Sequence, residues 1–456
     1  MKSIISTLPV MDIFTELDIA FQQMLLKSEQ ERLRIHSEFA IFYYNDYESI
    51  VSLLKKATLN KPFSQKTIDN ITFQHVDIIS KALNRIVSGI YTQRPVREFQ
   101  EGTPEENDLL ESIITGCSYN RSVRDVFRKA TYFNIAFAMP VFTGTGMRID
   151  VITPENVVVK TKKDYLQLKE IAIKRCDENK QIYYEVWTES EYYIIQSGSN
   201  AKLPVGNNDS IINPFGKIPI SILRMKEGID FYGEPNWNLF LNQKNYDIRL
   251  TDLNWSELMS IHQIWFGIDT NFPEGMQFTP GIIAQAKAQI GANPPSLSSV
   301  SADINYTALR ENIDWRMKQM LISEGISASS ASTELVAQSG AAKTIDEIEL
   351  NERRDETKEL LYDFEIDLLN NLRMIYNFYS PKDNLTETKT FNIIFNESKS
   401  YESIQDKIAR REMELKYNLK NITDFAMEDF EISELEAQEL IAKNYLANTN
   451  IQITDE

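Results

Sequence analysis

Hydrophobic residues recur every three or four positions along several stretches of the chain, with polar residues between them. In the first of these stretches, the apolar residues at intervals of four are Ile13, Leu17, Phe21 and Leu25. This spacing places side chains on one face of an α-helix. The pattern predicts helices over residues 11–58 (with a turn at Asn45-Asp46), 71–91, 236–259, 307–322 and about 343–379, followed by two or three short acidic helices.

A second pattern, in which shorter apolar runs are separated by turn residues, predicts β-strands. The sequence Gly144-Thr145-Gly146 is typical of a hairpin between two such runs. The predicted strands cover residues 136–142, 148–152, 169–175, 182–188, 192–196 and 390–395. We therefore expect an antiparallel sheet within residues 130–225, set among helices, and the predicted fold class is α+β, mainly helical.

Two segments follow neither pattern. Glycine and proline interrupt residues 263–306, which carry little charge and the apolar residues Trp265, Phe266, Phe272, Phe278, Ile282 and Ile283. These residues fit either a small local core or contacts between copies of the chain. The stretch Ser327–Ser332 holds only serine and alanine. It fits either an ordinary flexible linker or a loop that packs closely around an axis.

Composition narrows the class of protein. The chain has 456 residues, of which 42% are hydrophobic and 25% charged, as in globular proteins. Its 48 basic and 66 acidic residues give a net charge of −18, which argues against binding nucleic acid by gripping its phosphates. Two cysteines cannot build a disulfide framework, so a reducing compartment is favoured. We read no signal peptide and no long apolar run, and expect no membrane contact.

Residues that carry out catalysis in known motifs are not grouped in this sequence. The three histidines, His36, His75 and His262, are far apart, and neither a G-x-S-x-G nor an H-E-x-x-H motif occurs. The segment Ser339–Thr344 ends like a phosphate-binding loop, but Ala342 stands where a glycine must precede the lysine. We therefore expect no catalytic residue, no metal and no cofactor. A nucleotide-handling enzyme with an unrecognised site stays open as an alternative.

Five short motifs stand in an order that resembles one protein family. They are an aromatic turn, a helix ending in a Pro-Val turn, a strand-Pro-strand element, a G-x-I-P strand and an S-G-x-A pattern, at Phe42–Asp46, Asn84–Val96, Ile152–Val159, Asn213–Ile220 and Ser339–Lys343. Each motif alone is weak. Their order, with a helix, a Pro/Gly-rich segment, a second helix and a long helix between them, is similar to the portal proteins of tailed bacteriophages, the head-to-tail connectors.

This resemblance implies an architecture with named regions. A portal fold would have a wing of helices and antiparallel sheet, two stem helices, an α/β clip, a tunnel loop, a long helix and a small helical crown. In this sequence the wing would cover residues 1–235 and 343–398, the stem helices 236–259 and 307–325, the clip 260–306, the tunnel loop 326–342 and the crown 399–456.

The resemblance also implies a function. Portal proteins form a ring of twelve copies at one capsid vertex, and double-stranded DNA passes through it during packaging and ejection. The implied partners are the large terminase, a head-tail adaptor, and the major capsid and scaffolding proteins. The protein would be made in the host cytoplasm and reside in the virion. Another ring-forming head protein stays open as an alternative.

Three sets of residues would then face DNA or partner proteins. The tunnel loop would contribute Ser327, Ser329, Ser330, Ser332, Thr333, Glu334, Gln338 and Lys343. The stem offers Asp247, Asp252, Glu257, Glu311 and Asp314 as candidates for the lumen wall. The basic residues of the same helices could instead pair across subunits; they are Lys244, Arg249, Arg310, Arg316 and Lys318. The clip offers Trp265, Phe266, Phe272, Phe278 and Ile282 for contacts with an adaptor, the terminase or a neighbouring subunit. Acidic walls would let DNA slide, because they do not hold phosphates, and the acidic crown is expected to be the most negative rim.

Overall fold

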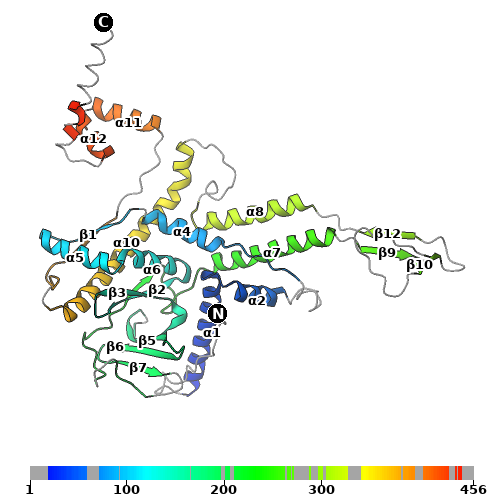
Figure 1. Cartoon of the computed structure of the whole chain (residues 1–456), viewed down its shortest axis with the longest axis horizontal. Helices are drawn as coiled ribbons and strands as arrows, with labels where there is room; N and C mark the ends of the chain where they lie inside the picture. Colours follow the sequence, from blue (N-terminus) through cyan, green and yellow to red (C-terminus); the bar gives the residue numbers. More distant parts are fainter. Residues whose placement is uncertain are drawn as a thin grey trace, which may run out of the picture. The chain divides into compact units, whose positions relative to one another are not determined.

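The computed structural model describes most of the chain: residues 19–58, 71–91, 93–164, 166–196, 201–205, 210–261, 264–268, 270–271, 287–288, 296–300, 305–326, 340–381, 384–395, 404–417, 419–430, 437–438 and 440–443. Among these, residues 19–26, 258–300, 340–353, 404–406, 428 and 430 are described by their backbone alone. The chain forms two compact units (Figure 1). The first consists of Met1–Leu335 and Glu349–Ser398, and the second of Val336–Ile348 and Lys399–Glu456.

Helices make up much of the first unit. They include α1 (Ile19–Tyr43), α2 (Tyr47–Thr58), α4 (Ile78–Ile90), α5 (Pro104–Gly116), α6 (Tyr119–Phe133) and the part of α10 (Gly340–Tyr379) from residue 349 onward. Their apolar faces meet in a core that contains Phe39, Leu83, Phe127 and Leu368, all at most 1% exposed. Burial of such side chains contributes roughly 1.5–3 kcal/mol each, so this core holds the helices together.

Short polar residues decide where several of these helices begin and end. Asn45, with φ of 52°, separates α1 from α2, which confirms the predicted turn. The side chain of Asp77 accepts a hydrogen bond from the backbone N–H of Ser80 and caps α4. Thr103 and Glu106 form a reciprocal capping box at the start of α5. These caps satisfy N–H groups that have no partner within the helix.

The predicted helix over residues 71–91 is wrong at its start, since α4 begins at Ile78. Residues 71–77 are not helical, because side chains of α7 (Trp237–Ile261) supply the acceptors that a helix would otherwise supply. The backbone N–H of Gln74 donates to Oγ1 of Thr251 at 2.9 Å. The backbone N–H of Ile78 donates to Oε1 of Gln243 at 3.0 Å. Contacts distant in sequence have overridden the local helical pattern.

A three-stranded antiparallel sheet follows α6. Its central strand β2 (Ile135–Phe142) pairs with β3 (Met147–Ile152) on one side and with β8 (Ser221–Arg224) on the other. The hairpin predicted at residues 144–146 is confirmed, and Gly144 adopts φ of 86°, which glycine tolerates without strain. The region expected to be sheet from residue 130 begins instead at Ile135, because α6 extends to Phe133.

A four-stranded antiparallel meander forms the second sheet. Its strands, in order, are β4 (Val157–Thr161), β5 (Leu168–Cys176), β6 (Ile182–Thr188) and β7 (Tyr192–Gln196). The hydroxyl of Tyr232 donates to the carbonyl of Val157 at 3.2 Å and accepts from the N–H of Val159 at 3.1 Å. One phenol therefore satisfies two backbone groups on the outer side of β4, where a further strand would otherwise pair.

A two-stranded ribbon joins distant parts of the first unit. In it, β1 (Val96–Phe99) pairs antiparallel with β13 (Phe391–Ile394), the strand predicted at 390–395. Arg97 of β1 forms a buried ion pair with Glu365 of α10, in which its Nε lies 2.5 Å from Oε2 of the carboxylate. The hydroxyl of Tyr91 donates to the same carboxylate at 2.8 Å. This buried, fully paired carboxylate fixes α10 against the ribbon, and removal of Arg97 would leave the buried charge of Glu365 uncompensated.

The second unit contains two short helices, α11 (Ile404–Lys416) and α12 (Ile422–Phe430). Asp429 lies 2.6 Å from Arg411 and 2.8 Å from Lys407, and these hydrogen bonds hold the pKa of Asp429 well below its usual range. The guanidinium of Arg411 also lies over the ring of Phe425. The two helices confirm the prediction of short helices here, but α11 is not acidic as predicted, since it contains four basic and three acidic residues. The capping box predicted at residues 433–436 lies outside the described residues.

The predicted class, α+β and mainly helical, is confirmed. The sequence interpretation missed β1, α5 and α6, and it placed the strand of the G-x-I-P motif within residues 213–220, whereas β8 begins at Ser221. A signal for α6 was present, because Val123, Val126, Phe127 and Ala130 follow helical spacing and are all buried.

Candidate functional site

Two long helices of the first unit lie side by side. They are α7 (Trp237–Ile261) and α8 (Tyr306–Ser323), within three residues of their predicted bounds (Figure 1). The chain between them contains β9 (Ile264–Ile268) and β12 (Ser296–Val300), which pair antiparallel, and the shorter pair β10 (Thr270–Asn271) and β11 (Lys287–Ala288). Two helices joined by a small segment that contains strands are the arrangement that the resemblance to portal proteins implied for the stem and the clip.

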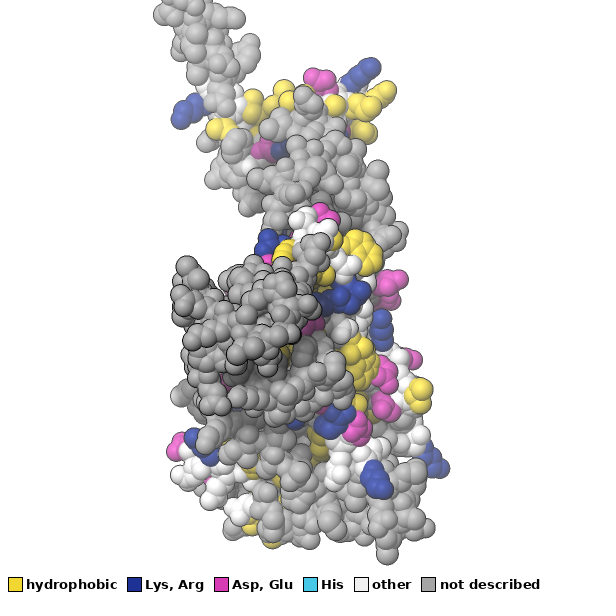
Figure 2. Space-filling model, turned by 90° about the vertical axis from the view of Figure 1, so that its right-hand side faces the viewer, with side chains coloured by type: hydrophobic (Ala, Val, Ile, Leu, Met, Phe, Trp, Pro, Cys, Tyr) yellow, Lys and Arg dark blue, Asp and Glu magenta, His cyan; other side chains and the backbone are white. Residues whose placement is uncertain are grey.

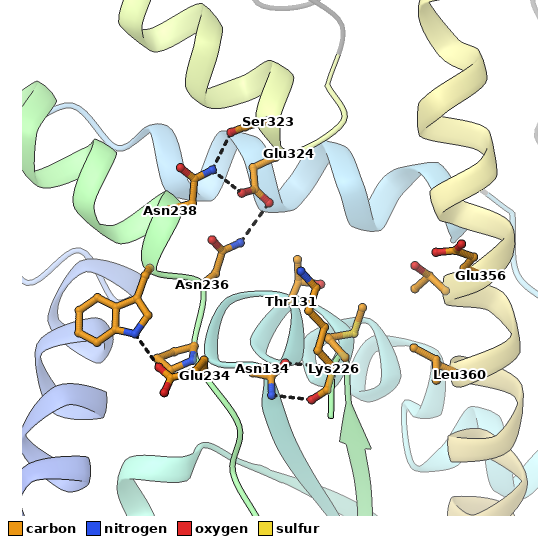
Figure 3. Close-up of a pocket in the computed structure, with 14 residues that line it drawn as sticks. Thr131, Asn134, Lys226, Glu234, Asn236, Asn238, Ser323, Glu324, Glu356 and Leu360 are labelled. Atoms are coloured by element: carbon orange, nitrogen blue, oxygen red, sulfur yellow. Dashed lines mark hydrogen bonds between the residues drawn. The ribbon is translucent and has the colours of Figure 1, made fainter. Parts of the chain in front are cut away.

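A cluster of hydrogen bonds joins the start of α7 to the end of α8. The carboxylate of Glu324, only 3% exposed, accepts from the side-chain amides of Asn236 at 3.0 Å and Asn238 at 3.2 Å. The amide of Asn238 also donates to Oγ of Ser323 at 2.6 Å. We call Asn236, Asn238, Ser323 and Glu324 the polar clasp (Figure 3).

The chain leaves α8 through a defined turn next to the clasp. Gly325 has φ of 73°, its N–H donates to the carbonyl of Ile322, and the N–H of Ile326 donates to the carbonyl of Leu321. This is a Schellman motif, and the buried side chains of Leu321 and Ile326 accompany it. The last turn of α8 is therefore fixed where the chain turns toward the serine-rich segment. The sequence interpretation missed the clasp, although Asn236 and Gly325 are typical of a helix start and a helix end.

The opposite ends of the two helices are also joined. Nη2 of Arg310 on α8 lies 2.6 Å from Oε1 of Glu257 on α7, and the hydroxyl of Tyr306 donates to the carbonyl of Ser256 at 3.0 Å. Between the two ends, Ile313, Met320 and Leu321 of α8 are buried. The two helices are thus joined at both ends and packed along their length, and together they form a rigid pair.

A further network fastens α7 to the segment 71–77. The carboxylate of Asp247 is 0% exposed; its Oδ2 accepts from Nδ1 of His75 at 2.7 Å and its Oδ1 from the amide of Gln243 at 2.9 Å. Burial raises the pKa of Asp247, while the hydrogen bonds from His75 and Gln243 oppose that shift. The prediction that Asp247 lines a lumen is wrong, because its side chain is fully covered within its own subunit.

The other four stem carboxylates have different surroundings. Asp252, Glu311 and Asp314 are exposed, and Glu257 is half-buried in its pair with Arg310. These acidic groups share α8 and the end of α7 with exposed apolar side chains, of which Trp315 is the largest, at 57% exposed. The exposed surface of the helix pair therefore combines acidic groups with uncovered apolar area and with the basic side chains of Arg249, Arg310 and Arg316.

The remaining predicted site residues lie mostly outside the described part of the chain. Trp265 and Phe266 are consecutive on β9, where their positions are paired with Ser299 and Ser298 of β12, so they belong to opposite faces of that ribbon. Lys343 lies in the first turn of α10. Phe272, Phe278, Ile282 and the predicted tunnel-loop residues 327–338 lie outside the described residues.

A cavity of about 730 Å³ opens beside the clasp (Figure 3). Glu324, Asn236 and Asn238 border one side, Glu356 and Leu360 of α10 the other, and Thr131, Asn134 and Lys226 lie between them. Within the described residues, no group of histidine, cysteine, aspartate and glutamate is arranged to hold a metal ion. The side-chain amide of Asn134 donates to the carbonyl of Lys226 at 2.9 Å and to the carbonyl of Tyr232 at 3.0 Å, and so fixes this side of the cavity.

Comparison with known proteins identifies the class. The family model described as phage portal protein, SPP1 Gp6-like, matches residues 25–376, which include the helix pair, its strands and nearly all of α10. The chain therefore belongs to the SPP1 Gp6-like phage portal protein family. Proteins of this family are structural rather than enzymatic and form a capsid-associated oligomer in the virion. No curated protein matches the chain. In the described part of the chain, no helix is both long enough and apolar enough to cross a bilayer.

Proposed function

We propose that this protein is the subunit of a portal ring, expected to hold twelve copies, through which double-stranded DNA enters and leaves a phage capsid. Membership of the portal family supports this proposal. The observation that carries it is the helix pair α7/α8, joined at both ends and bearing acidic groups on its exposed surface. A conduit for a stiff, charged polymer needs walls that neither bend nor bind the polymer.

The regions take the roles expected from the sequence. Residues 1–235 and 343–398 form the wing, α7 and α8 the stem, residues 260–306 the clip, residues 326–342 the tunnel loop and residues 399–456 the crown. The polar clasp then lies where the stem meets the tunnel loop. Through Glu324 and the fixed turn at Gly325, it holds the point from which that loop leaves α8.

Ring formation accounts for the exposed apolar side chains of the stem. Leu309, Trp315 and Ile322 of α8 are 40–57% exposed. We expect a neighbouring subunit to cover these large apolar side chains of α8, because exposed apolar patches mark contact surfaces. A head-to-tail contact repeated around an axis closes into a ring when the rotation per subunit fits.

Charge supports passage rather than capture of DNA. Asp252, Glu257, Glu311 and Asp314 are the stem carboxylates that we assign to the lumen, and each chain carries a net charge of −18. Such a field repels phosphates, whereas a basic lining would release counterions and hold DNA tightly. In the tunnel loop, Glu334 would repel the phosphates of DNA as well, whereas Lys343 would attract them.

Partner proteins are expected at the two ends of the stem and around the wing. The clip, with Trp265, Phe266, Phe272, Phe278 and Ile282, would receive the large terminase and later the head-tail adaptor. The wing and crown would contact capsid and scaffolding proteins. In this assignment the chain itself carries out no catalytic turnover, and the terminase supplies the energy of packaging.

The location in the virion tests this proposal. Gold-labelled antibody against the chain should mark assembled particles at one vertex only, the vertex that carries the tail. Labels distributed over many vertices, or absent from purified particles that package DNA, would contradict the portal assignment.

A further inference from the structure

The corner between α11 and α12 in the second unit carries a concentrated set of exposed apolar side chains. The N–H of Tyr417 donates to the carbonyl of Met413, and the N–H of Leu419 donates to the carbonyl of Glu414, which continues the end of α11 into the turn. Asn421 then caps α12 by accepting from the N–H of Asp424 at 2.9 Å. We call Met413, Tyr417, Leu419 and Ile422 the corner patch.

These four side chains are not used to hold the two helices together. Asp429 pairs with Lys407 and Arg411, and Arg411 covers Phe425, so the contact between the helices lies on a different side of α11. The corner-patch residues are 61%, 65%, 73% and 61% exposed, whereas Phe425 and Ala426 are buried. Met413 and Tyr417 are one helical turn apart and so lie on one face. Figure 2 shows hydrophobic side chains along the described surface of this unit.

If the second unit faced only solvent, we would not expect it to carry the exposed apolar side chains of the corner patch. Large apolar groups gathered within ten residues mark a contact with another molecule, since monomeric proteins avoid large apolar patches. The patch offers no stacked aromatic platform of the kind that binds single strands and no basic groove that follows a phosphate backbone. A protein surface is the occupant that best fits it.

The charges around the corner patch indicate which protein contacts it. Residues 404–420 contain five basic and three acidic residues, whereas residues 421–456 contain nine acidic residues and one basic residue, Lys443. Within the unit, Lys407 and Arg411 pair with Asp429. The positive charge next to the patch therefore comes from Lys416 and Lys420, whereas residues 421–456 are strongly acidic. In a ring, each copy presents two different faces to its two neighbours. A second copy therefore supplies the opposite charge beside the apolar contact.

We propose that the corner patch is a contact surface for the C-terminal unit of a second copy of this chain. The inference rests on the proposed ring and adds to it a particular interface outside the stem. This contact would link neighbouring crowns, with apolar burial at its centre and Lys416 and Lys420 facing acidic residues of the neighbour.

The assembly equilibrium of the full chain tests this interface. The double variant Leu419→Glu/Ile422→Glu places two charges in the patch without touching a buried side chain. The matched control is Ile212→Glu/Ile229→Glu, at two isoleucines of the first unit that are 72% and 101% exposed. By mass photometry over a dilution series, the concentration at which half the chains are in rings should rise at least tenfold for the patch variant and less than twofold for the control.

A photo-crosslinker in place of Tyr417 gives a second readout that does not depend on weakened assembly. Products of twice the chain mass, crosslinked to residues of the second unit, are expected. Crosslinks only within one chain, or to the first unit of a neighbour, would overturn the proposal. Unchanged ring stability in the patch variant would also overturn it while leaving the ring intact. Wild-type chain that stays monomeric at every concentration would overturn the ring itself and this interface with it.

Discussion

The side-chain amide of Asn236, just before α7, donates to the carboxylate of Glu324, just after α8, at 3.0 Å. The two residues are 88 positions apart in sequence, and α7, α8 and the strands between these helices lie between them. Together with the hydrogen bonds of Asn238, this partly buried bond joins the start of α7 to the end of α8.

The variant Glu324→Ala should loosen this base. Loss of the carboxylate leaves the amides of Asn236 and Asn238 with fewer acceptors, and the expected cost is about 2 kcal/mol of unfolding free energy. Amide hydrogen exchange should accelerate at the start of α7 and the end of α8. Glu311→Ala, at an exposed carboxylate of the same helix, is the control and should change stability by less than about 0.5 kcal/mol. Equal effects of the two variants would contradict the role given to the clasp.

The variant Asp247→Ala should cost more than any exposed stem carboxylate. It removes the acceptor of His75 and Gln243 inside a closed network, and the expected loss is about 3 kcal/mol, measured by urea unfolding. Asp314→Ala is the matched control on the other stem helix. Equal losses of unfolding free energy in Asp247→Ala and Asp314→Ala would contradict the burial of Asp247 in a closed network.

Histidine 36 should make stability depend on pH. Its Nδ1 lies 2.9 Å from the carbonyl of Arg32, and burial, followed by the nearby Arg32 charge, lowers the pKa of His36 from 6.5 to about 4. Between these values the unfolded chain binds a proton that the folded chain does not. Stability therefore falls as the pH drops from 6.5 to 4, by up to about 3 kcal/mol.

The variant His36→Phe isolates this effect, because phenylalanine keeps a ring beside Phe133 and Tyr232 but cannot be protonated. Urea unfolding at several pH values should give a smaller decrease between pH 6.5 and 4 for the variant than for the wild type. Parallel curves for the two proteins would show that other groups cause the decrease.

Reversal of stem charges should slow DNA passage. In the triple variant Asp252→Lys/Glu311→Lys/Asp314→Lys, a lumen that repels phosphates would become one that binds them. The amount of DNA packaged per unit time should fall several-fold at low salt and recover as salt is raised. The control Glu101→Lys/Glu178→Lys/Glu227→Lys makes the same charge change at exposed sites of the wing. Equal slowing by both variants would mean that the stem carboxylates do not face DNA.

Local signals account for the elements that the sequence predicted well. Periodic apolar residues and flanking turn signals placed α7, α8 and α10 within three residues of their observed bounds. Asn45 and Gly144 marked turns because their backbone conformations, with positive φ, favour these residue types. The order of motifs then led to the portal family, which the family model confirms.

The errors arose where partners distant in sequence decide the outcome. Residues 71–77 have a helical pattern, yet Gln243, Asp247 and Thr251 take up their polar groups. The same contacts bury Asp247, which on sequence alone looked like its exposed neighbour Asp252. A one-dimensional pattern contains no signal for a hydrogen bond that spans more than 160 residues, such as the one from Ile78 to Gln243.

Electron microscopy of the purified full-length chain, with particles viewed end-on, tests the central claim most directly. The portal assignment predicts closed rings of twelve subunits around an open channel. Particles that remain monomers at all concentrations, or that form rings with no open channel, would contradict it.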